Sequence, residues 1–410
     1  MITPMLPSHA LLQLVPARLP QALQRLRDRI WIRSNSTVDL SASEASPRHL
    51  TFPAARRLPL RAVSGPHHYG KLWDQRWFRL RLPSAPAGSA TRYLRWNDQA
   101  EATLFVKGVP HYGFDVAHRF APLPSEAREV WVESVVSQTA IWHPEATGLD
   151  PAGSRFESAE LFTRDDLAWQ VYHDLLVLDD LMRVELRAVF PNAELEFGSI
   201  GTRPSLDRIP PLLRRLLRYL DDAVNALDAE GIPAARRSLA KAFEELPGAG
   251  APPAAVLTGH AHIDLVWLWP ERVGEFKAVH TFATANRMMA AYPEMQFGYS
   301  QPASYRAVAR RSPDLMSAVR RRIRQGRWEP VGATEVESDT LIACGEALAR
   351  SFLLGQEGFC DLTGKPSSLL WLPDVFGYAG CLRRPLLLHH QADLERGKPL
   401  PVFQFCLGRD

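Results

Sequence analysis

The feature that most constrains the fold is a change of pattern at residues 247–253. This Pro-Gly-Ala-Gly-Ala-Pro-Pro segment is a linker, because its prolines and glycines favour neither helix nor strand. After it, short apolar runs alternate with longer segments of helical spacing, which indicates right-handed strand–helix–strand units and a parallel sheet. We expect strands at 254–259, 295–300, 328–333 and 367–373, and helices at 272–292, 303–325 and 345–360.

The segment before the linker has a different pattern. From about 51 to 200, short runs such as Trp77–Leu82 and Glu101–Val106 alternate apolar and polar residues, and Gly, Pro and Asn separate them. We expect a β-sandwich of jelly-roll type over 51–200. The fold class is therefore α/β plus all-β. The other expected regions are a helical lead-in at 1–50 with a helix at 16–33, and a helical connector and linker at 205–253 with helices at 205–228 and 233–246.

Composition excludes several classes of protein. The chain of 410 residues is 46% hydrophobic, as expected for a globular protein with more than one domain. A formal net charge of +3 gives no reason to expect a nucleic-acid partner. Four cysteines do not form a disulfide framework, and no run approaches about 18 apolar residues. We therefore expect a cytoplasmic protein that does not span a membrane.

The segment Gly259–Pro270 carries the first candidate site. His262 and Asp264 follow an apolar run, and residues at i and i+2 of an extended backbone point to the same side. The two side chains could therefore hold one divalent metal ion. We expect His260 to be a supporting or structural residue. Trp267 and Trp269 could line a sugar-binding subsite, although one of them could equally pack into the core.

A second candidate lies 110 residues later. The run Leu369–Pro373 is apolar and leads to Asp374, which is followed by Val-Phe-Gly-Tyr. Polar residues at the C-terminal ends of parallel strands meet at one edge of the sheet. We therefore expect Asp374 to lie close to His262 and Asp264.

The strings His-x-His-Ile-Asp-x-x-Trp-Leu-Trp-Pro and Trp-Leu-Pro-Asp-Val-Phe-Gly-Tyr, in this order, resemble the retaining α-mannosidases of glycoside hydrolase family 38, in particular their cytosolic and bacterial branch. The resemblance implies that residues 254–382 form the first part of a seven-stranded βα barrel. It also implies that the preceding β-sandwich is the extra N-terminal domain of that branch.

The family resemblance also implies a mechanism and a substrate. One Zn²⁺ ion, which another divalent metal could replace, would be held by His262, Asp264 and Asp374, and Asp374 would also be the nucleophile. The substrate would be a mannose-containing oligosaccharide, and full-length relatives are often homo-oligomers. Asp339 matches an acidic position near the family's site and is a candidate substrate-binding residue. Two positions depart from the family pattern. Relatives usually have Trp or Tyr in place of Glu335, and Asn in place of Leu341.

The tail at 383–410 does not resemble the family. Its codons, read one base later with suitable synonymous choices, give a string containing Lys-Leu-Thr-Trp-Asn, which looks like the family segment expected here. We therefore expect a C-terminal truncation caused by a frameshift near residue 382. The general acid/base and the distal zinc histidine would then be absent, and this chain by itself would be inactive.

Two other functions remain open on the sequence alone. The chain could be a non-catalytic, carbohydrate-binding remnant of such an enzyme, which only the aberrant tail favours. It could also be another metal-dependent barrel hydrolase, such as an amidohydrolase or deacetylase that uses His-x-His. The Trp-Leu-Trp-Pro string and the Asp374 segment favour the α-mannosidase over this last class.

Overall fold

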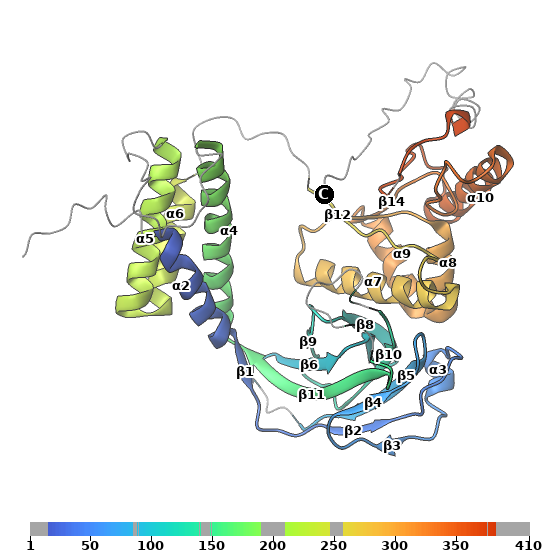
Figure 1. Cartoon of the computed structure of the whole chain (residues 1–410), viewed down its shortest axis with the longest axis horizontal. Helices are drawn as coiled ribbons and strands as arrows, with labels where there is room; N and C mark the ends of the chain where they lie inside the picture. Colours follow the sequence, from blue (N-terminus) through green and yellow to red (C-terminus); the bar gives the residue numbers. More distant parts are fainter. Residues whose placement is uncertain are drawn as a thin grey trace, which may run out of the picture. The chain divides into compact units, whose positions relative to one another are not determined.

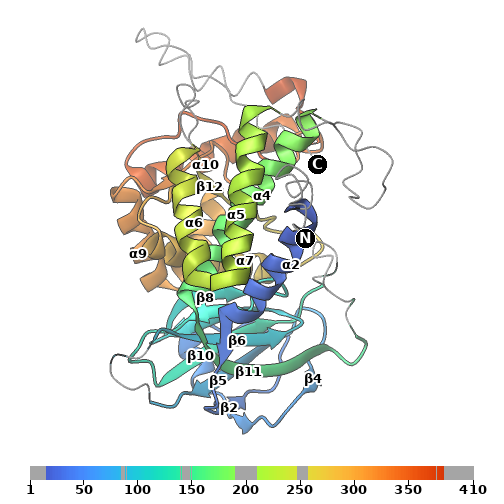
Figure 2. The same ribbon diagram turned by 90° about the vertical axis from the view of Figure 1, so that its left-hand side faces the viewer.

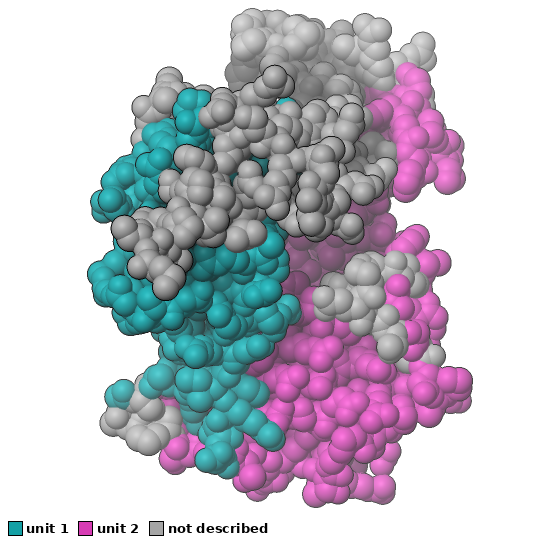
Figure 3. All heavy atoms as spheres, turned by 60° about the vertical axis from the view of Figure 1, so that its left-hand side comes forward, with its two compact units in different colours: residues 1–35, 88–93, 161–254 teal, residues 36–87, 94–160, 255–410 magenta. Residues whose placement is uncertain are grey.

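The computed structural model describes residues 15–84, 88, 90–138, 140, 148, 150–189, 210–246, 257–374 and 376–382. The chain divides into two compact units, coloured separately in Figure 3: unit 1 contains 1–35, 88–93 and 161–254, and unit 2 contains 36–87, 94–160 and 255–410. In the described part of the chain, no helix combines the length and the apolar character that crossing a membrane would need.

The described residues of unit 1 contain four helices. They are α2 (Val15–Ile30), α4 (Asp166–Val189), α5 (Pro211–Glu230) and α6 (Ile232–Glu245), which lie side by side in Figures 1 and 2. Each presents an apolar stripe to one shared core, because buried residues recur three and four positions apart. In α5 these residues are Leu213, Leu216, Leu217, Leu220 and Val224.

Two sequence predictions need correction here. Helix α4 lies inside the segment predicted to be all-β, although Val171, Leu175, Leu178 and Met182 have helical spacing and are all buried. The predicted helix at 16–33 ends at Ile30, because the next three residues form strand β1 (Trp31–Arg33), which pairs with β11 (Ser154–Arg164). Residues 205–209 of the predicted 205–228 helix lie outside the described residues.

The β-rich segment forms two sheets. One has the strand order β1-β11-β6-β9 with β4 also paired to β11, and the other has the order β3-β2-β5-β10-β7-β8. The pairings recorded in the second sheet are antiparallel. Besides helix α3 (Phe52–Ala55), the elements are β2 (Asp39–Ala42), β3 (Arg61–Ala62), β4 (His67–Tyr69), β5 (Gln75–Arg81), β6 (Arg92–Asp98), β7 (Glu101–Val106), β8 (Val109–Phe114), β9 (Phe120–Pro122) and β10 (Glu129–Val135).

The turn between β7 and β8 shows how local sequence sets this topology. Lys107 and Gly108 join the two strands, and both have positive φ, 51° and 83°. Two consecutive residues with positive φ give the turn whose twist matches that of a hairpin, and glycine adopts this conformation without steric cost. Lys107 and Gly108 therefore form the turn of a hairpin between β7 and β8.

After the linker, unit 2 contains the expected parallel sheet. Its strand order is β12-β13-β14, and both pairings are parallel. The elements are β12 (Gly259–His260), α7 (Glu271–Ala291), β13 (Phe297–Tyr299), α8 (Pro302–Arg311), α9 (Pro313–Arg324), β14 (Trp328–Pro330), α10 (Gly345–Thr363) and the short 3₁₀ helix η3 (Gly380–Leu382) (Figure 1). The prediction of strand–helix–strand units is therefore confirmed for three strands.

Three details of this region differ from the prediction. The helix expected at 303–325 is two helices, because Pro313 cannot continue α8 and the Oγ of Ser312 accepts a hydrogen bond from Leu315 N (3.4 Å) to begin α9. The segment 367–373 is irregular, since prolines flank its apolar residues and Ser367 bonds the backbone of Leu369 locally. Residues 254–256 of the first predicted strand lie outside the described residues.

Two half-buried histidines in unit 2 have strongly lowered pKa values. Burial lowers the pKa of His49 from 6.5 to about 4, assisted by the charges of Arg311 and Arg272. Burial likewise lowers the pKa of His111 from 6.5 to about 4, assisted by Arg287. Both rings bond a backbone carbonyl through Nε2, His49 to Trp73 (2.8 Å) and His111 to Pro122 (3.2 Å). Each ring is therefore neutral in the folded protein near pH 6.

We expect these histidines to make folding stability fall between about pH 6.5 and pH 4. In that range the unfolded histidines bind a proton and the folded ones do not, so acid favours the unfolded state. Each group contributes less than about 1.4 kcal/mol per pH unit, because both are only partly shielded from solvent. Urea unfolding at pH 7.5 and pH 5 should show a smaller loss of stability in the His49→Gln/His111→Gln variant than in the parent chain. An equal loss would contradict the prediction.

Candidate active site

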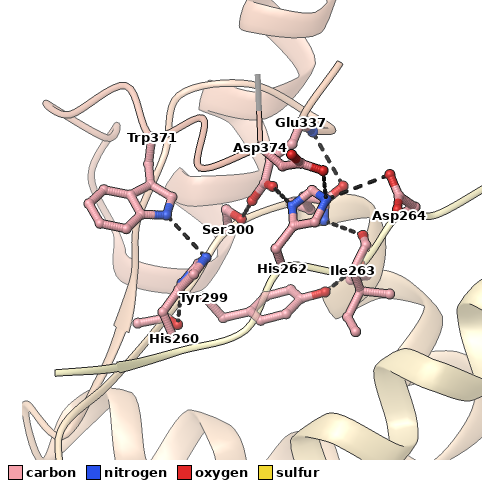
Figure 4. Close-up of polar contacts among 12 residues, drawn as sticks. His260, His262, Ile263, Asp264, Tyr299, Ser300, Glu337, Trp371 and Asp374 are labelled. Atoms are coloured by element: carbon pink, nitrogen blue, oxygen red, sulfur yellow. Dashed lines mark hydrogen bonds and ion pairs between the residues drawn. The ribbon is translucent and has the colours of Figure 1, made fainter. Parts of the chain in front are cut away.

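His262 lies on the loop that follows β12, and three acidic side chains from different segments surround it. Its Nδ1 is hydrogen-bonded to Glu337, and the other carboxylate oxygen of Glu337 accepts a hydrogen bond from Ser300 (Figure 4). The Glu337 side chain is only 3% exposed. Since a carboxylate accepts hydrogen bonds, Nδ1 carries the proton and the lone pair of the neutral ring is on Nε2.

The Nε2 atom of His262 faces two further carboxylates. Asp264 Oδ1 and Asp374 Oδ2 both lie 3.6 Å from it, in ion-pair but not hydrogen-bond contact. Nε2 is buried and has no hydrogen-bond partner. Figure 4 shows the three side chains converging from the loop after β12 and from the segment that contains Asp374. The structure thus brings together the three residues predicted as the metal and nucleophile set.

The acidic neighbours determine the protonation of His262. Burial by itself lowers the pKa of His262, but the hydrogen bond and charge of Glu337, with the charges of Asp264 and Asp374, outweigh it and raise the pKa above its usual 6.5. The negative charges of the three carboxylates would stabilise either a proton on Nε2 or a metal cation at the same place.

The donor set agrees in kind with a zinc site. Zinc binds histidine nitrogen and carboxylate oxygen, and a buried nitrogen without a partner between two carboxylates is the arrangement that a cation would complete. In the described part of the chain, however, no three His, Cys, Asp or Glu side chains close around one point as metal ligands do. His262, Asp264 and Asp374 therefore fit a metal ion by the chemistry of their donor atoms and by their proximity, but they do not form a closed set of ligands.

Gln301 joins the two loops that carry these groups. Its side chain donates a hydrogen bond to Ile263 O (2.8 Å) and accepts one from Glu337 N (3.3 Å). Gln301 has φ 61°, a left-handed conformation that costs a residue other than glycine roughly 1 kcal/mol or more. This backbone strain at the end of β13 is maintained because the side chain then reaches both loops at once.

His260, expected to be a supporting or structural residue, makes hydrogen bonds to two neighbouring segments. A carbonyl can only accept, so its Nδ1 donates to Gly298 O (3.0 Å), and its Nε2 accepts from Trp371 Nε1 (3.2 Å). Burial lowers the pKa of His260, which keeps the ring neutral for this pair of bonds. His260 thereby links β13 to the irregular segment that leads to Asp374.

The candidate sugar-contacting residues occupy different environments. Trp267 is 51% exposed, whereas Trp269 is 8% exposed and donates a hydrogen bond to Asp264 O (3.0 Å). The Oδ1 of Asp339 accepts a hydrogen bond from Leu341 N (2.9 Å) within its own turn. Glu335, one of the departures from the family pattern, forms an ion pair with Arg306 on α8.

Sequence reasoning missed Glu337, Ser300 and Gln301. Ser300 and Gln301 directly follow β13, and polar residues in that position of a parallel sheet are site candidates on general grounds. Glu337 is two residues before Asp339, and only the contact with His262 distinguishes the two acids.

Comparison with known proteins finds similarity to one group of enzymes. The model of the glycosyl hydrolases family 38 N-terminal domain matches residues 253–392, which extends past position 382 into the start of the tail. Alpha-mannosidase 2C1 from Homo sapiens is 28% identical over 89% of this chain and 34% of its own length. Alpha-mannosidase G from Dictyostelium discoideum is 24% identical over the same shares. An alpha-mannosidase from Saccharomyces cerevisiae is 38% identical over 30% of this chain and 11% of its own length.

The relatives found are all named alpha-mannosidases, and each is longer than this chain. The chain spans about a third of the length of the curated relatives that it matches over most of its residues. The family match includes the loop after β12, both loops joined by Gln301, and Asp374, so the cluster around His262 lies entirely within it. Residues 253–392 are thus similar to the N-terminal domain of the glycosyl hydrolases of family 38, and the relatives that match most of the chain are α-mannosidases.

Proposed function

We propose that this chain supplies the metal-binding and nucleophilic part of a zinc-dependent retaining α-mannosidase that hydrolyses terminal α-mannosides of oligosaccharides. The observation that carries the proposal is the pair of carboxylates, Asp264 and Asp374, each 3.6 Å from the unpartnered Nε2 of His262. The names of the relatives support α-mannoside hydrolysis as the activity.

The proposed roles follow from the chemistry of the side chains. His262 and Asp264 would hold the metal ion together with Asp374, and Glu337 would fix the ring of His262 through Nδ1. A bound zinc ion would supply positive charge that orients two sugar hydroxyl groups and stabilises the transition state. We propose that Trp267, which is half exposed, contacts the sugar, and we retain Asp339 as a weaker candidate for substrate binding.

Asp374 would carry out the covalent step. One of its oxygens attacks the anomeric carbon, a carbon–oxygen ester bond forms, and the glycosidic bond breaks. The leaving oxygen needs a proton from a second carboxyl group about 5–5.5 Å away, which later activates the water that releases mannose. The acids recorded around His262 in the described residues are Asp264, Glu337 and Asp374, and each already has one of the roles above. We therefore propose that none of these three acids is the acid/base and that, as the family resemblance implies, this group lies outside residues 1–382.

The finer features of the fold belong to the same proposal. We propose that β12, β13 and β14 are the first strands of the seven-stranded barrel expected from the family, that the preceding sheets are a jelly-roll-like domain, and that the completed enzyme is homo-oligomeric. The cytoplasmic location and the frameshift near residue 382 stay predictions from the sequence.

The decisive experiment compares two proteins. One is the 410-residue chain; the other, hereafter the completed chain, joins residues 1–382 to the part of a family relative that follows its matching region. We expect the completed chain to hydrolyse an aryl α-mannoside, to lose this activity in chelator and to regain it with zinc. The 410-residue chain should bind zinc weakly and show no hydrolysis.

Other outcomes would identify the remaining functions. Hydrolysis of an N-acetyl or cyclic-amide substrate in place of the mannoside would favour another metal-dependent barrel hydrolase. Binding of mannosides by both proteins without any hydrolysis would favour the carbohydrate-binding remnant. Clear hydrolysis by the 410-residue chain would show that an acid within residues 1–382 was overlooked.

A further inference from the structure

Trp269 connects the loop that contains Asp264 to helix α7. Its indole Nε1 donates a hydrogen bond to the backbone carbonyl of Asp264 (3.0 Å). The ring is buried in a small apolar cluster with Val135 of β10 and with Val273 and Phe276 of α7. A ring held on both sides in this way is unavailable for stacking on a sugar, but it fixes the position of the backbone that carries the Asp264 carboxylate.

A buried ion pair extends this contact into the antiparallel sheet. Lys277 Nζ on α7 lies 4.4 Å from the centroid of the Trp269 ring and donates hydrogen bonds to both carboxylate oxygens of Glu101 (2.6 Å each). Glu101 is the first residue of β7, and both charged side chains are less than a tenth exposed. A cation held over an indole face in a dry environment is attracted to it more strongly than in water, so the ammonium group restrains the ring.

The backbone packing leaves the loop little freedom. A Cβ atom added to Gly274 of α7 would lie 2.0 Å from Leu265 O, so the helix backbone and the residue after Asp264 are in direct contact. Any side chain here would force the loop away from the helix. The loop that carries Asp264 is therefore held against α7 by close packing, and Trp269 adds a directional hydrogen bond.

We propose that Glu101, Lys277 and Trp269 are positioning residues that fix the Asp264 carboxylate for the metal site, so that the antiparallel sheet forms part of this site. The part of this proposal that concerns metal binding rests on the proposed zinc function. The restraint on the loop that carries Asp264 follows from the contacts themselves. We refer to these three residues as the Asp264 support.

The test uses two variants of the 410-residue chain and one matched control. Trp269→Phe keeps a ring but removes the hydrogen bond to Asp264 O. Glu101→Gln/Lys277→Met removes the buried charges together and so leaves neither unpaired. The control is Glu133→Gln/Arg311→Met, which removes a comparably buried ion pair (2.6 Å, with side chains 1% and 9% exposed) between β10 and α8. No contact of that pair with Trp269 or Asp264 is recorded among the described residues.

Two measurements are made on each protein: zinc affinity by competition with a chromophoric chelator, and amide hydrogen exchange of the peptide covering 261–270. We expect both support variants to bind zinc about tenfold more weakly than the parent and to exchange faster in this peptide. The control should match the parent in both, even where its unfolding midpoint falls. Trp269→Phe is a mild change, so it decides the question if the double variant does not fold.

The outcomes separate this proposal from the proposed function. A parent chain that binds no zinc would count against the metal site, and the exchange rates would then decide the support by themselves. Unchanged exchange in the support variants, or equal effects in the control, would overturn the Asp264 support. If the parent binds zinc, a support variant that exchanges faster but binds zinc as tightly as the parent would also overturn the Asp264 support.

Discussion

Replacing Asp374 with alanine should abolish hydrolysis of an aryl α-mannoside by the completed chain, with a loss of roughly four orders of magnitude or more. Without its carboxylate no ester to the anomeric carbon can form, and the remaining groups can only bind the sugar. Initial rates at saturating substrate measure the loss. The matched control is Asp339→Asn, because asparagine keeps the Oδ1 that accepts a hydrogen bond within its own turn and loses only the negative charge, which should affect binding at most.

A covalent probe identifies the nucleophile independently of rates. A fluorinated mannosyl fluoride forms the ester quickly and hydrolyses it slowly, so the labelled residue can be located by digestion and mass spectrometry. We expect the label on the peptide that contains Asp374. A label on Asp339 or Glu337 would show that the nucleophile has been assigned to the wrong acid.

The second large effect concerns metal binding. In the completed chain, His262→Ala and Asp264→Ala should each remove tightly bound zinc and activity together, because each deletes one ligand from a site with few protein ligands. Glu337→Gln should have an intermediate effect, of about 10–100-fold in zinc affinity, since the amide can still contact His262 Nδ1 but no longer offers a carboxylate. Metal content after dialysis and affinity by competition with a chelator measure the series.

The order of these effects is the informative part of the zinc series. Stoichiometric zinc in the His262→Ala/Asp264→Ala double variant would disprove the assigned metal site. A loss in Glu337→Gln as large as that in His262→Ala would indicate that Glu337 is itself a ligand and not a support for the ring. The conservative Ser300→Ala variant, which removes only a donor to Glu337, should have the smallest effect.

The parallel part of the fold could be predicted because its signals are local. The short stretches that contain Gly259, Phe297 and Trp328 carry apolar residues, and the segments between them have helical spacing; both signals can be read without knowledge of distant contacts. The segment 367–373 has the same apolar character but is irregular, because a strand forms only where a neighbour accepts its backbone hydrogen bonds. The helix α4 was missed for a different reason: no glycine or proline separates it from β11, and its start is marked only by Asp165, whose Oδ1 accepts hydrogen bonds from Leu167 N and Ala168 N.

The proximity of the three proposed ligand residues could be predicted, whereas the residues that contact and support them could not. His262, Asp264 and Asp374 have side chains with distinctive chemistry at the ends of apolar runs, and the family resemblance added their roles. Glu337 and Gln301 act through contacts across the sheet to residues 75 and 38 positions away, which no spacing along the chain reveals. The sequence left open whether Trp269 contacts sugar or packs into the core. Its contacts with Asp264 and Lys277 show that it is packed in the core.

Gln301 also restricts how this protein could be redesigned. Its amide must be a donor toward Ile263 and an acceptor toward Glu337 at the same time, so glutamate could serve only one loop and leucine neither. Glycine would relieve the left-handed backbone but would release both loops, and asparagine, which tolerates that backbone, is one methylene shorter. A change at half-exposed Trp267 would act mainly on its own surroundings, including the edge-on contact with Trp269, whereas a change at position 301 would alter the relative placement of two loops in one step.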